Sequence, residues 1–397
     1  MRLDPVIRVL FAIGAYPPST GGAQLHTAAL ADALESFTTV SPAVLTLWRT
    51  TRSDWLRAST LDLSVGRSVS DEQVPVTTAG LSSDWSRRDS FARMTYLAAR
   101  RRSASHFASR LDLGVLDVDV IHIVRLGREH LALAVLEAAQ RKGLPVAMTA
   151  NHHPRWSSWR PDPVWQAIYK RCDLLFALTH AEKEMLVRLG VAPERIMITG
   201  IGPLLSSTPA AATDVLASVG PRPYVLFLGQ QLNYKRADIA LKMVRLLAND
   251  FPGIQLVFAG PVSEQTVSMA HRLGLDDRVR QLGVVSTELK TALLQHASCL
   301  VHPSAQESFG GVLVEAASVG LPFICADTAQ LREVSDTLGW GQVAKVTPQS
   351  FAVAAGAVLR NRPTEEARQA AAKRAQTLFS WQSLAMRYAD SYALLSK

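Results

Sequence analysis

The sequence predicts an α/β fold made of two doubly wound parallel-sheet domains that face a cleft. The 397 residues exceed one ordinary hydrophobic core and fit two domains of about 200 residues each. In both halves, short apolar runs alternate with segments of helical period, as buried parallel sheets require. A small, polar, proline-bearing stretch at 204–223 separates the halves, as a linker does. We therefore place domains at 1–205 and 206–379, with a final helix at 380–397.

The first domain is predicted from its apolar runs. Strands are expected at 6–13, 118–124, 144–150 and 174–179, because these runs are short and helix-like segments separate them. An amphipathic helix is expected at 22–36, directly after the first strand. Ligands of such sheets bind outside the carboxyl ends of the strands, so residues that follow a strand are candidates for a site.

The segment 50–86 breaks this alternation. It is rich in Ser, Thr and Arg and has no clear period, which predicts a long loop. Six arginines crowd the next stretch, 87–102, which we interpret as a solvated helix face. The alternative is a surface for an acceptor or for peripheral contact with an anionic membrane. Its aromatic residues follow helical spacing and form no base-stacking platform, so no nucleic-acid partner is expected.

The second domain repeats the alternation from residue 224 onward. Helical segments separate its apolar runs, and the chain closes on a further helix, WQSLAMRYADSYALLSK. The strands are expected in YVLFLG, IQLVFAG, VRQLG, SCLVHPS and LPFICAD. This half therefore has the same architecture as the first, without repeating its sequence.

Composition excludes several classes of protein. Hydrophobic residues make up 48% and charged residues 19%, which is typical of a soluble packed enzyme and not of a disordered or fibrous chain. No apolar run reaches membrane-spanning length. The three cysteines lie far apart without metal-ligand spacing, which indicates a reducing, cytoplasmic setting. The net charge of +8 favours anionic partners such as phosphates.

The strongest motif is the segment HPSAQESFGGVLVEAASVGLP. A strand ends at Pro303, a loop carries Glu307, and Gly310-Gly311 opens a helix. Glycines at a helix start allow close approach of a ligand, and the free N–H groups favour an anion. Glu315 lies one turn into this helix and can accept two hydrogen bonds from a ribose diol, while Glu307 can reach sugar hydroxyls. The alternative is a glycine-capped helix with two surface glutamates, but the apolar neighbours of Glu315 make its exposure doubtful.

A second motif, VLFLGQQLNYKRADIAL, places two cations after a strand that ends at Gly229. Lys235 and Arg236 are expected to open a helix, where cations oppose the macrodipole by roughly 0.3–1 kcal/mol each. Asp238 offsets part of that cost, and a bound diphosphate would offset all of it, with Lys235 as point charge and Arg236 as a fork. The alternative is a pair of solvated basic residues.

Two weaker elements lie at strand ends of the first half. Gly21-Gly22 follows the first strand but matches neither the GxGxxG dinucleotide pattern nor a phosphate-binding P-loop, so it indicates either a phosphate or acceptor contact or a tight turn. Asn151, His152 and His153 follow the strand at 144–150, where one histidine can meet a sugar hydroxyl and a polar loop is the alternative. No further ligands at suitable spacing make a zinc site there.

The sequence also contains a DxD triplet, Asp117-Val118-Asp119. Such a DxD triplet binds manganese in single-domain glycosyltransferases, but here it precedes a strand instead of following one. We therefore expect no metal site. No GxSxG or Cys–His arrangement predicts hydrolysis through a covalent triad either.

Taken together, these segments resemble retaining glycosyltransferases of the GT-B fold, the family 4 group related to bacterial glycogen synthase and lipid mannosyltransferases. The Glu307-x7-Glu315 spacing with SFGG between is similar to the family's acidic motif, written E-G-F-G-x-x-x-x-E. FLGQQLNYKRADIAL, FAGP, DDRVRQLGVVS and FSWQSLAMRYADSYALL also resemble family segments. The likeness covers nearly the whole chain except residues 50–110.

The resemblance implies two Rossmann-like domains, the N-terminal one binding the acceptor and the C-terminal one binding a nucleotide-sugar donor of UDP or GDP type. The last helix would pack back on the N-terminal domain. It further implies transfer with retention to a glycan, lipid-linked or small-molecule acceptor, with no essential metal and no cofactor beyond the donor itself. The catalytic residues it implies are Lys235, Glu307 and His153. The donor-binding residues it implies are Gly21, Gly22, Gly229, Arg236, Val284, Ser308, Phe309, Gly310, Gly311, Val312 and Glu315.

The chain departs from the family pattern at three places. Gln230 stands where the family often has Arg, and Ile201-Gly202-Pro203 replaces its usual Asn-Gly-Val-Asp. The common T-x-H becomes Thr149-Ala150-Asn151, so the histidine can be His152 or His153, and we favour His153. Gln230 and the altered Thr149–His153 region support one rival, a non-catalytic nucleotide-sugar-binding subunit. A separate rival is a sugar-nucleotide epimerase or hydrolase on the same fold.

Overall fold

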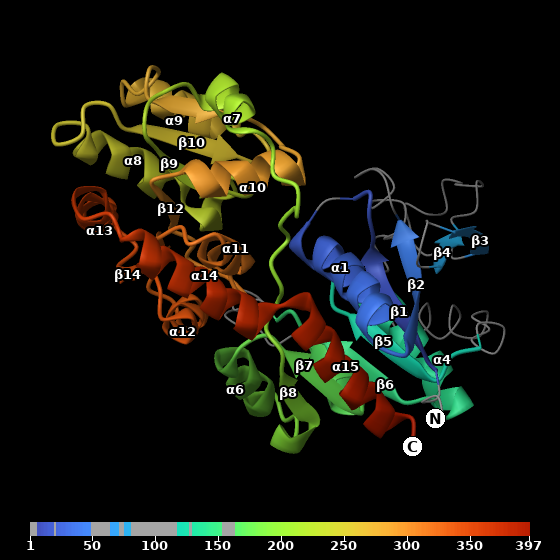
Figure 1. The fold of residues 1–397 in the computed structure, drawn as a ribbon. Coiled ribbons are helices and arrows are strands. Elements are labelled where there is room, and N and C mark those ends of the chain that lie inside the picture. The colour runs from blue at the N-terminus through green and yellow to red at the C-terminus, as the bar shows by residue number, and fades with distance from the viewer. Residues whose placement is uncertain are drawn as a thin grey trace. The chain divides into compact units, whose positions relative to one another are not determined.

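The protein, seen in a computed structural model, consists of two α/β units (Figure 1). The structure describes residues 6–19, 21–48, 64–70, 75–80, 117–126, 129–152 and 163–397. Unit 1 comprises residues 1–200 with 381–397, and unit 2 comprises residues 201–380. The division thus follows Gly200, where the sequence placed it after residue 205.

Unit 1 is built on an eight-stranded sheet of order β3-β4-β2-β1-β5-β6-β7-β8. Every neighbouring pair is parallel except β3 and β4, which are antiparallel. The strands are β1 (Ile7–Ala15), β2 (Val40–Trp48), β3 (Ser64–Ser70), β4 (Pro75–Gly80), β5 (Val120–Val124), β6 (Val146–Thr149), β7 (Leu174–Ala177) and β8 (Ile196–Ile198). The prediction of a structureless loop over 50–86 was therefore wrong in part, because β3 and β4 extend the sheet there.

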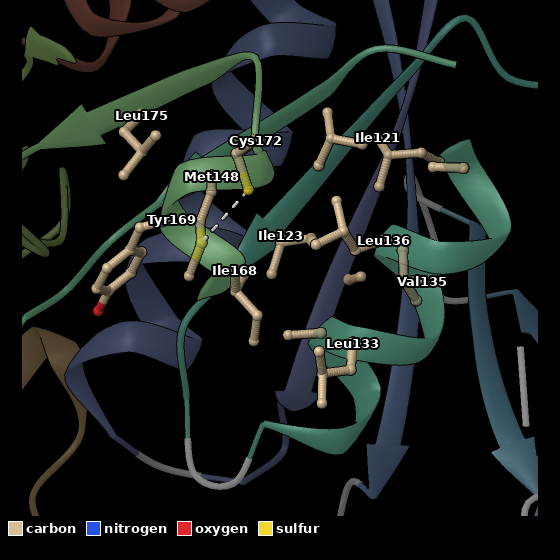
Figure 2. Packing of buried hydrophobic residues seen from close by; sticks show 14 of the residues in the cluster. Ile121, Ile123, Leu133, Val135, Leu136, Met148, Ile168, Tyr169, Cys172 and Leu175 are labelled. Carbon is tan, nitrogen blue, oxygen red and sulfur yellow. Dashed lines mark hydrogen bonds between the residues drawn. The ribbon is translucent and has the colours of Figure 1, made fainter. Parts of the chain in front are cut away.

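Alternation along the strands gives the sheet of unit 1 two apolar faces. Leu10 and Ala12 of β1 pack into one core with α4 (His130–Lys142) and α5 (Pro163–Arg171), which Figure 2 shows around Met148 and Cys172. Val9, Phe11 and Ile13 face the other core, with α1 (Gly22–Phe37) and α15 (Trp381–Leu395). Successive side chains of a strand point to opposite faces, so one apolar run supplies both cores. The described part of unit 1 also contains α6 (His180–Arg188) and the short η3 (Pro193–Arg195).

Helix α15 belongs to unit 1, although unit 2 precedes it in the sequence. Tyr388 and Tyr392 are fully buried against the sheet. The Tyr392 hydroxyl lies 2.5 Å from Nδ1 of His122, and the Tyr388 hydroxyl lies 3.2 Å from Thr199 Oγ1. These hydrogen bonds satisfy polar groups that burial alone would penalise, so they fix the helix in one position.

Unit 2 is built on a six-stranded parallel sheet of order β11-β10-β9-β12-β13-β14. Its strands are β9 (Tyr224–Leu228), β10 (Gln255–Ala259), β11 (Val279–Gln281), β12 (Cys299–His302), β13 (Phe323–Ala326) and β14 (Gln342–Ala344). Its helices are α7 (Ala212–Val219), η4 (Asn233–Lys235), α8 (Ala237–Leu247), α9 (Glu264–Arg272), α10 (Thr287–His296), α11 (Gly311–Ser318), α12 (Ala329–Leu338), α13 (Pro348–Arg360) and α14 (Glu365–Phe379). The order places β9, β10 and β12 at the centre, so the loops after them lie side by side.

The stretch 204–223 is not a linker but part of unit 2. It contains α7, which packs on α10. The Ala210 N–H donates to the Glu288 carbonyl at 3.1 Å, and the Ser206 N–H donates to Thr291 Oγ1 at 2.9 Å. Small polar residues suggested a linker, but here their main chain pairs with α10 instead of with water.

Candidate functional site

Glycines end three neighbouring strands of unit 2 and leave their carboxyl edge free of side chains. Gly229, Gly260 and Gly283 follow β9, β10 and β11 with φ of 127°, 145° and 69°. A Cβ on Gly260 would lie 2.2 Å from the Gly229 carbonyl oxygen, which no side chain tolerates. The strand ends therefore approach each other closely, and the loops that follow carry the functional side chains.

The loop after β9 presents Lys235 from a short 3-10 turn. Contrary to the prediction, Lys235 and Arg236 do not open α8: Lys235 ends η4, and Arg236 is the residue before the helix, in the left-handed region at φ 56°. The Arg236 guanidinium donates to both carboxylate oxygens of Asp238, at 2.9 and 3.1 Å. The Asp238 carboxylate therefore offsets the unfavourable positive charge of Arg236 at the helix start. Lys235 has a different partner.

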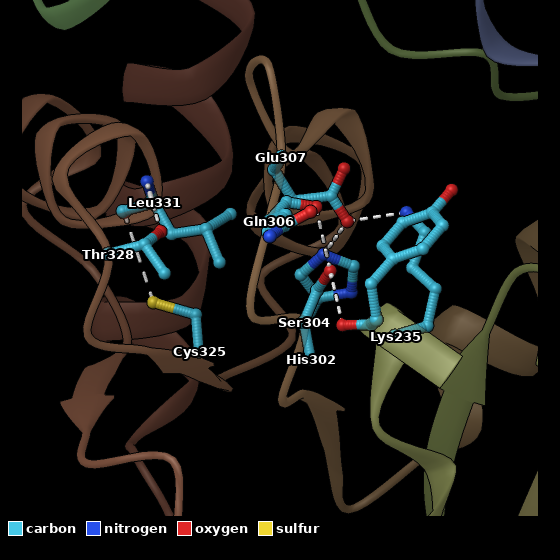
Figure 3. Close-up of polar contacts among 9 residues, drawn as sticks. Lys235, His302, Ser304, Gln306, Glu307, Cys325, Thr328 and Leu331 are labelled. Atoms are coloured by element: carbon cyan, nitrogen blue, oxygen red, sulfur yellow. Dashed lines mark hydrogen bonds and ion pairs between the residues drawn. The ribbon is translucent and has the colours of Figure 1, made fainter. Parts of the chain in front are cut away.

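Lys235 pairs with Glu307, which comes from the loop after β12 (Figure 3). His302 at the end of β12 lies 2.8 Å from the same carboxylate oxygen, through Nε2. Burial alone would raise the pKa of Glu307, but Lys235 and His302 outweigh it and hold that pKa well below its usual range. Glu307 is therefore an ionised carboxylate that bridges two loops.

Main-chain hydrogen bonds tie these two loops together. The Ala305 N–H donates to the Tyr234 carbonyl at 2.8 Å. The Ser304 hydroxyl, fully buried, lies 3.4 Å from the same carbonyl and 3.1 Å from that of Gln306. Because the backbone itself is cross-linked, the Lys235–Glu307 pair is held by the fold and not only by its own attraction.

The next residues form the glycine-started helix that the sequence predicted. Gly310 adopts φ 96°, and a Cβ there would lie 2.4 Å from Leu331 Cδ2. No side chain caps α11, and its first turn has no acidic residue. The ring of Phe309 is buried edge-on against Phe379 and is therefore not available to a ligand. A ligand at this turn would meet the main chain of Phe309 instead. The positive end of α11 thus suits an anion.

Glu315 lies one turn into α11 and is 6% exposed, as its apolar neighbours indicated. Lys290 of α10 lies 2.8 Å from Glu315 Oε1, and the Leu204 N–H donates to the same oxygen at 3.3 Å. Burial raises the pKa of Glu315, and these two contacts offset that only in part. Lys290 was not predicted, because no short sequence motif links α10 to α11.

Val284 lies after β11 and is an exposed residue of the predicted donor set. Its side chain is 67% exposed, and it follows the positive-φ Gly283. A β-branched apolar side chain left in solvent gains nothing from that position. Val284 thus lies open to solvent at the sheet edge of unit 2, next to Gly283, whose carbonyl accepts the Gly260 N–H at 2.7 Å.

In unit 1, the Gly21-Gly22 turn opens α1 without a capping side chain or an acidic first turn. Space around Gly22 is open, and Gly21 is extended with the Gln24 side chain close to it. The turn therefore has room for a ligand in its own unit. Its backbone is not in the left-handed region, so conformational freedom is not why these positions are glycine.

His153, one of the predicted catalytic residues, lies outside the described residues, as does the basic stretch 87–102. The neighbouring His152 is 5% exposed and lies at the carboxyl edge of the sheet of unit 1. Its Nδ1 lies 2.6 Å from Nη1 of Arg125, which follows β5. His152, the histidine that the sequence favoured less, thus lies in a polar network.

The DxD triplet has a structural partner. Asp119 accepts the Arg8 N–H at 2.8 Å and two guanidinium contacts at 3.0 and 2.8 Å, and Asp117 also pairs with Arg8. Among the described residues, no three His, Cys, Asp or Glu side chains gather as a metal ion requires. The described helices include none that is long and apolar enough to cross a membrane.

The sequence of unit 2 matches a known protein family. Residues 212–377 match the family described as Glycosyl transferases group 1. Unit 2 carries a glycosyl transferases group 1 domain. The chain is 29% identical over 243 residues to a D-inositol 3-phosphate glycosyltransferase of Xylanimonas cellulosilytica, a match that covers 57% of this chain and 58% of the relative. The chain thus spans less than two thirds of the length of the curated relatives it matches.

Solved structures share the whole architecture. HepE of Anabaena, crystallised with UDP and glucose, has a TM-score of 0.73 at 15% identity and covers 98% of this chain and 100% of its own. A protein of Listeria monocytogenes described as a UDP-N-acetylglucosamine 2-epimerase has a TM-score of 0.64 at 14% identity, over 97% and 95% of the two chains. At these identities the likeness shows the fold, and the predicted GT-B fold of two Rossmann-like units is confirmed.

Proposed function

We propose that the protein is a retaining glycosyltransferase that moves a sugar from a nucleoside diphosphate sugar to an acceptor hydroxyl. The observation that carries the proposal is the Lys235–Glu307 pair beside the uncapped start of α11. A buried carboxylate, an ammonium and a helix N-terminus together offer what a sugar diphosphate needs: hydroxyl acceptors next to anion donors. The group 1 domain over residues 212–377 supports the same assignment.

Lys235 acts on the leaving group. In the proposed reaction the ammonium turns from Glu307 to the diphosphate, and Glu307 then accepts hydrogen bonds from the donor sugar. The N–H groups of Gly310, Gly311 and Val312 stabilise the charge that develops as the sugar–phosphate bond breaks, which is electrostatic catalysis. The acceptor hydroxyl attacks the same face that the diphosphate leaves and gives its proton to the departing diphosphate oxygen, so configuration is retained without a protein nucleophile.

Glu315 binds the nucleoside end of the donor. Its carboxylate faces the two hydroxyls of a ribose, and Lys290 and the Leu204 N–H hold it in place. In this proposal the main chain at Val284, an exposed residue after β11, contacts the base. A charged carboxylate accepts stronger hydrogen bonds than a neutral group does. A ribose offers Glu315 two hydroxyls where a deoxyribose offers one, so the buried Glu315 favours a ribose.

The acceptor is proposed from the names of the relatives and from the charge of the chain. The relatives are named D-inositol 3-phosphate glycosyltransferases, and unit 1 of this chain would hold such a polar acceptor at its strand ends. A basic protein of net charge +8 suits an anionic acceptor. A glycan, a glycolipid and a small metabolite are therefore tested alongside D-inositol 3-phosphate.

A sugar-nucleotide epimerase is the rival function to which a structural comparison points, because the Listeria protein described as an epimerase shares the fold. An epimerase or hydrolase converts the donor when no acceptor is present. The non-catalytic alternative relies on Gln230 and on the altered Thr149–His153 region, and it predicts binding without turnover.

The experiment is a donor panel followed by a product analysis. UDP- and GDP-sugars are screened by thermal shift, at concentrations well above the dissociation constant. The donor that stabilises the protein is then incubated with and without each acceptor, and the anomeric configuration of the product is read by NMR. Acceptor-dependent transfer with retention is expected. Inverted product, conversion of donor alone or binding without turnover would each reject the proposal.

A further inference from the structure

His302 closes β12 with its side chain against Glu307 (Figure 3). The residue is 4% exposed, and its Nε2 lies 2.8 Å from Glu307 Oε1. An ionised carboxylate has acceptors only, so Nε2 must carry the proton of this hydrogen bond. Lys235 donates to the same oxygen. Oε1 of Glu307 therefore has two donors, which come from two different segments of unit 2.

The two donors differ in how firmly the fold holds them. His302 is part of a buried strand, where it pairs with Cys325 of β13. Lys235 ends the short turn η4, and its side chain is 19% exposed, against 5% for that of His302. A lysine also carries its ammonium on a flexible four-carbon stem. Lys235 can therefore leave Oε1 while His302 stays.

The departure of Lys235 would not require the main chain to move. The Ala305 N–H donates to the Tyr234 carbonyl at 2.8 Å, which joins the loop after β12 to η4 independently of the side chains. The two loops thus remain joined when the pair of Lys235 and Glu307 opens. Rotation of the lysine side chain is enough to turn its ammonium to another anion.

The departure would, however, leave Glu307 without its cation. The Glu307 side chain is 12% exposed, and burial acts to raise its pKa, which Lys235 and His302 together oppose. A buried carboxylate that loses its donors takes up a proton, because an unpaired buried charge is costly. A protonated Glu307 would accept hydrogen bonds from a sugar less strongly than the carboxylate does.

We propose that His302 is a positioning residue that keeps its hydrogen bond to Oε1 when Lys235 transfers to the diphosphate, so that Glu307 stays ionised and oriented toward the donor sugar. The inference rests on the proposed function, because the diphosphate is the anion that draws Lys235 away. Lys235 and His302 both bond to Oε1, so in the described part of the chain neither of them occupies Oε2. Oε2 is the oxygen that meets the sugar, and His302 acts only through Glu307.

The first test imitates the departure of Lys235 and needs neither ligand nor turnover. Lys235→Met removes the cation, and the carboxyl carbon of Glu307 is followed by ¹³C NMR in glutamate-labelled protein, with Glu307→Gln identifying the signal. Glu307 should remain ionised at neutral pH in Lys235→Met. When His302→Met is added, its titration should shift to higher pH, because the last donor to the charged form is gone. An unchanged titration in the folded double variant would overturn the proposal.

A matched variant separates the hydrogen bond from the packing of the ring. Gln and Met have side chains of nearly equal length, but only Gln can donate, and its amide reaches the position of Nε2. His302→Gln in the Lys235→Met background should therefore return the titration of Glu307 toward that of Lys235→Met alone. If Gln and Met shifted it equally, the ring and not its N–H would matter, and the proposal would be wrong.

The second test measures the role of His302 in turnover. We expect kcat to fall by about 10- to 100-fold in His302→Met, the cost of a buried acceptor left unsatisfied, and by less than about fivefold in His302→Gln. Equal losses in both variants, with unchanged melting temperatures, would contradict the positioning role. A wild type that transfers no sugar would reject the proposed function instead, and the titration of Glu307 would still decide whether His302 holds the carboxylate.

Discussion

The two units differ in the charge of their buried polar groups. In unit 2, two buried carboxylates each contact a lysine, Glu307 with Lys235 and Glu315 with Lys290. In unit 1, buried histidines take the central places: His122 lies 2.7 Å from Thr149 Oγ1 and stacks on Phe11 at 4.8 Å. Burial lowers the pKa of His122 to about 3, so this ring is uncharged at neutral pH.

The difference separates a site made to exchange partners from one made to stay fixed. A lysine paired with a carboxylate can give up that partner for a phosphate, because one anion replaces another. A neutral ring bonded through its nitrogens has no such exchange and instead fixes the strands and α15. We therefore expect substitutions in unit 2 to change catalysis and binding first, and those in unit 1 to change stability and its pH dependence.

Lys235→Ala is expected to have the largest effect. It removes the cation that neutralises the leaving diphosphate, so kcat should fall by roughly 10³-fold, the size of a lost electrostatic contact in a transition state. Steady-state kinetics with the preferred donor measures it. Lys242→Ala, an exposed lysine on α8, is the matched control and should leave kcat within twofold, roughly the effect of a surface substitution.

Substitution of Arg236, the neighbour of Lys235, is expected to have a smaller effect on kcat. Arg236 contacts Asp238 instead of Glu307 and occupies a left-handed position that glycine adopts freely. Arg236→Gly should therefore keep the turn and lower kcat by less than roughly tenfold. If Arg236→Gly lost as much activity as Lys235→Ala, the fork and not the lysine would carry the diphosphate.

Glu315→Gln is expected to weaken donor binding by about 10- to 100-fold, because a charged hydrogen bond is replaced by a neutral one. Isothermal calorimetry with the nucleoside diphosphate measures it, and kcat at saturating donor should change much less. Lys290 loses its partner in this variant, so Glu315→Gln with Lys290→Met is the control for misfolding. Unchanged affinity would show that Glu315 holds Lys290 and not a ribose.

Much of unit 2 follows from short-range patterns. The strand ends at Gly229 and Gly283 and the glycine start of α11 were readable because glycine, strand and loop are adjacent in the sequence. His302 was also within reach, as a polar residue that closes the apolar run Cys299–His302 five positions before Glu307. Residues that meet through neighbouring sequence can be predicted from it.

Contacts between distant segments could not be predicted in this way. Lys290 reaches Glu315 from another helix, and its spacing resembles that of any surface lysine. Arg236 was predicted to open a helix together with Lys235, but it adopts a left-handed conformation before α8 and pairs with Asp238. The contact between His152 and Arg125 joins the segments that follow β6 and β5, so no local pattern reveals it.

The pH dependence of stability tests the unit 1 side of the comparison. His26 of α1 is 8% exposed and lies 5.2 Å from the Trp381 ring of α15, and burial lowers its pKa to about 4. Below its unfolded pKa of about 6.5, the unfolded chain binds a proton that the folded chain refuses, so stability is full above that pH and falls as pH decreases.

Between about pH 6.5 and pH 5 the loss from His26 alone should be about 2 kcal/mol. His26→Phe keeps an aromatic ring against Trp381 and removes the titration, so the free energy of unfolding should depend less steeply on pH in this variant. Urea unfolding followed by circular dichroism at several pH values measures it. A slope that His26→Phe does not reduce would mean that the folded protein binds the proton at His26. The buried histidines of unit 1 would then not be fixed in the neutral form, and the contrast with the exchangeable lysine pairs of unit 2 would fail.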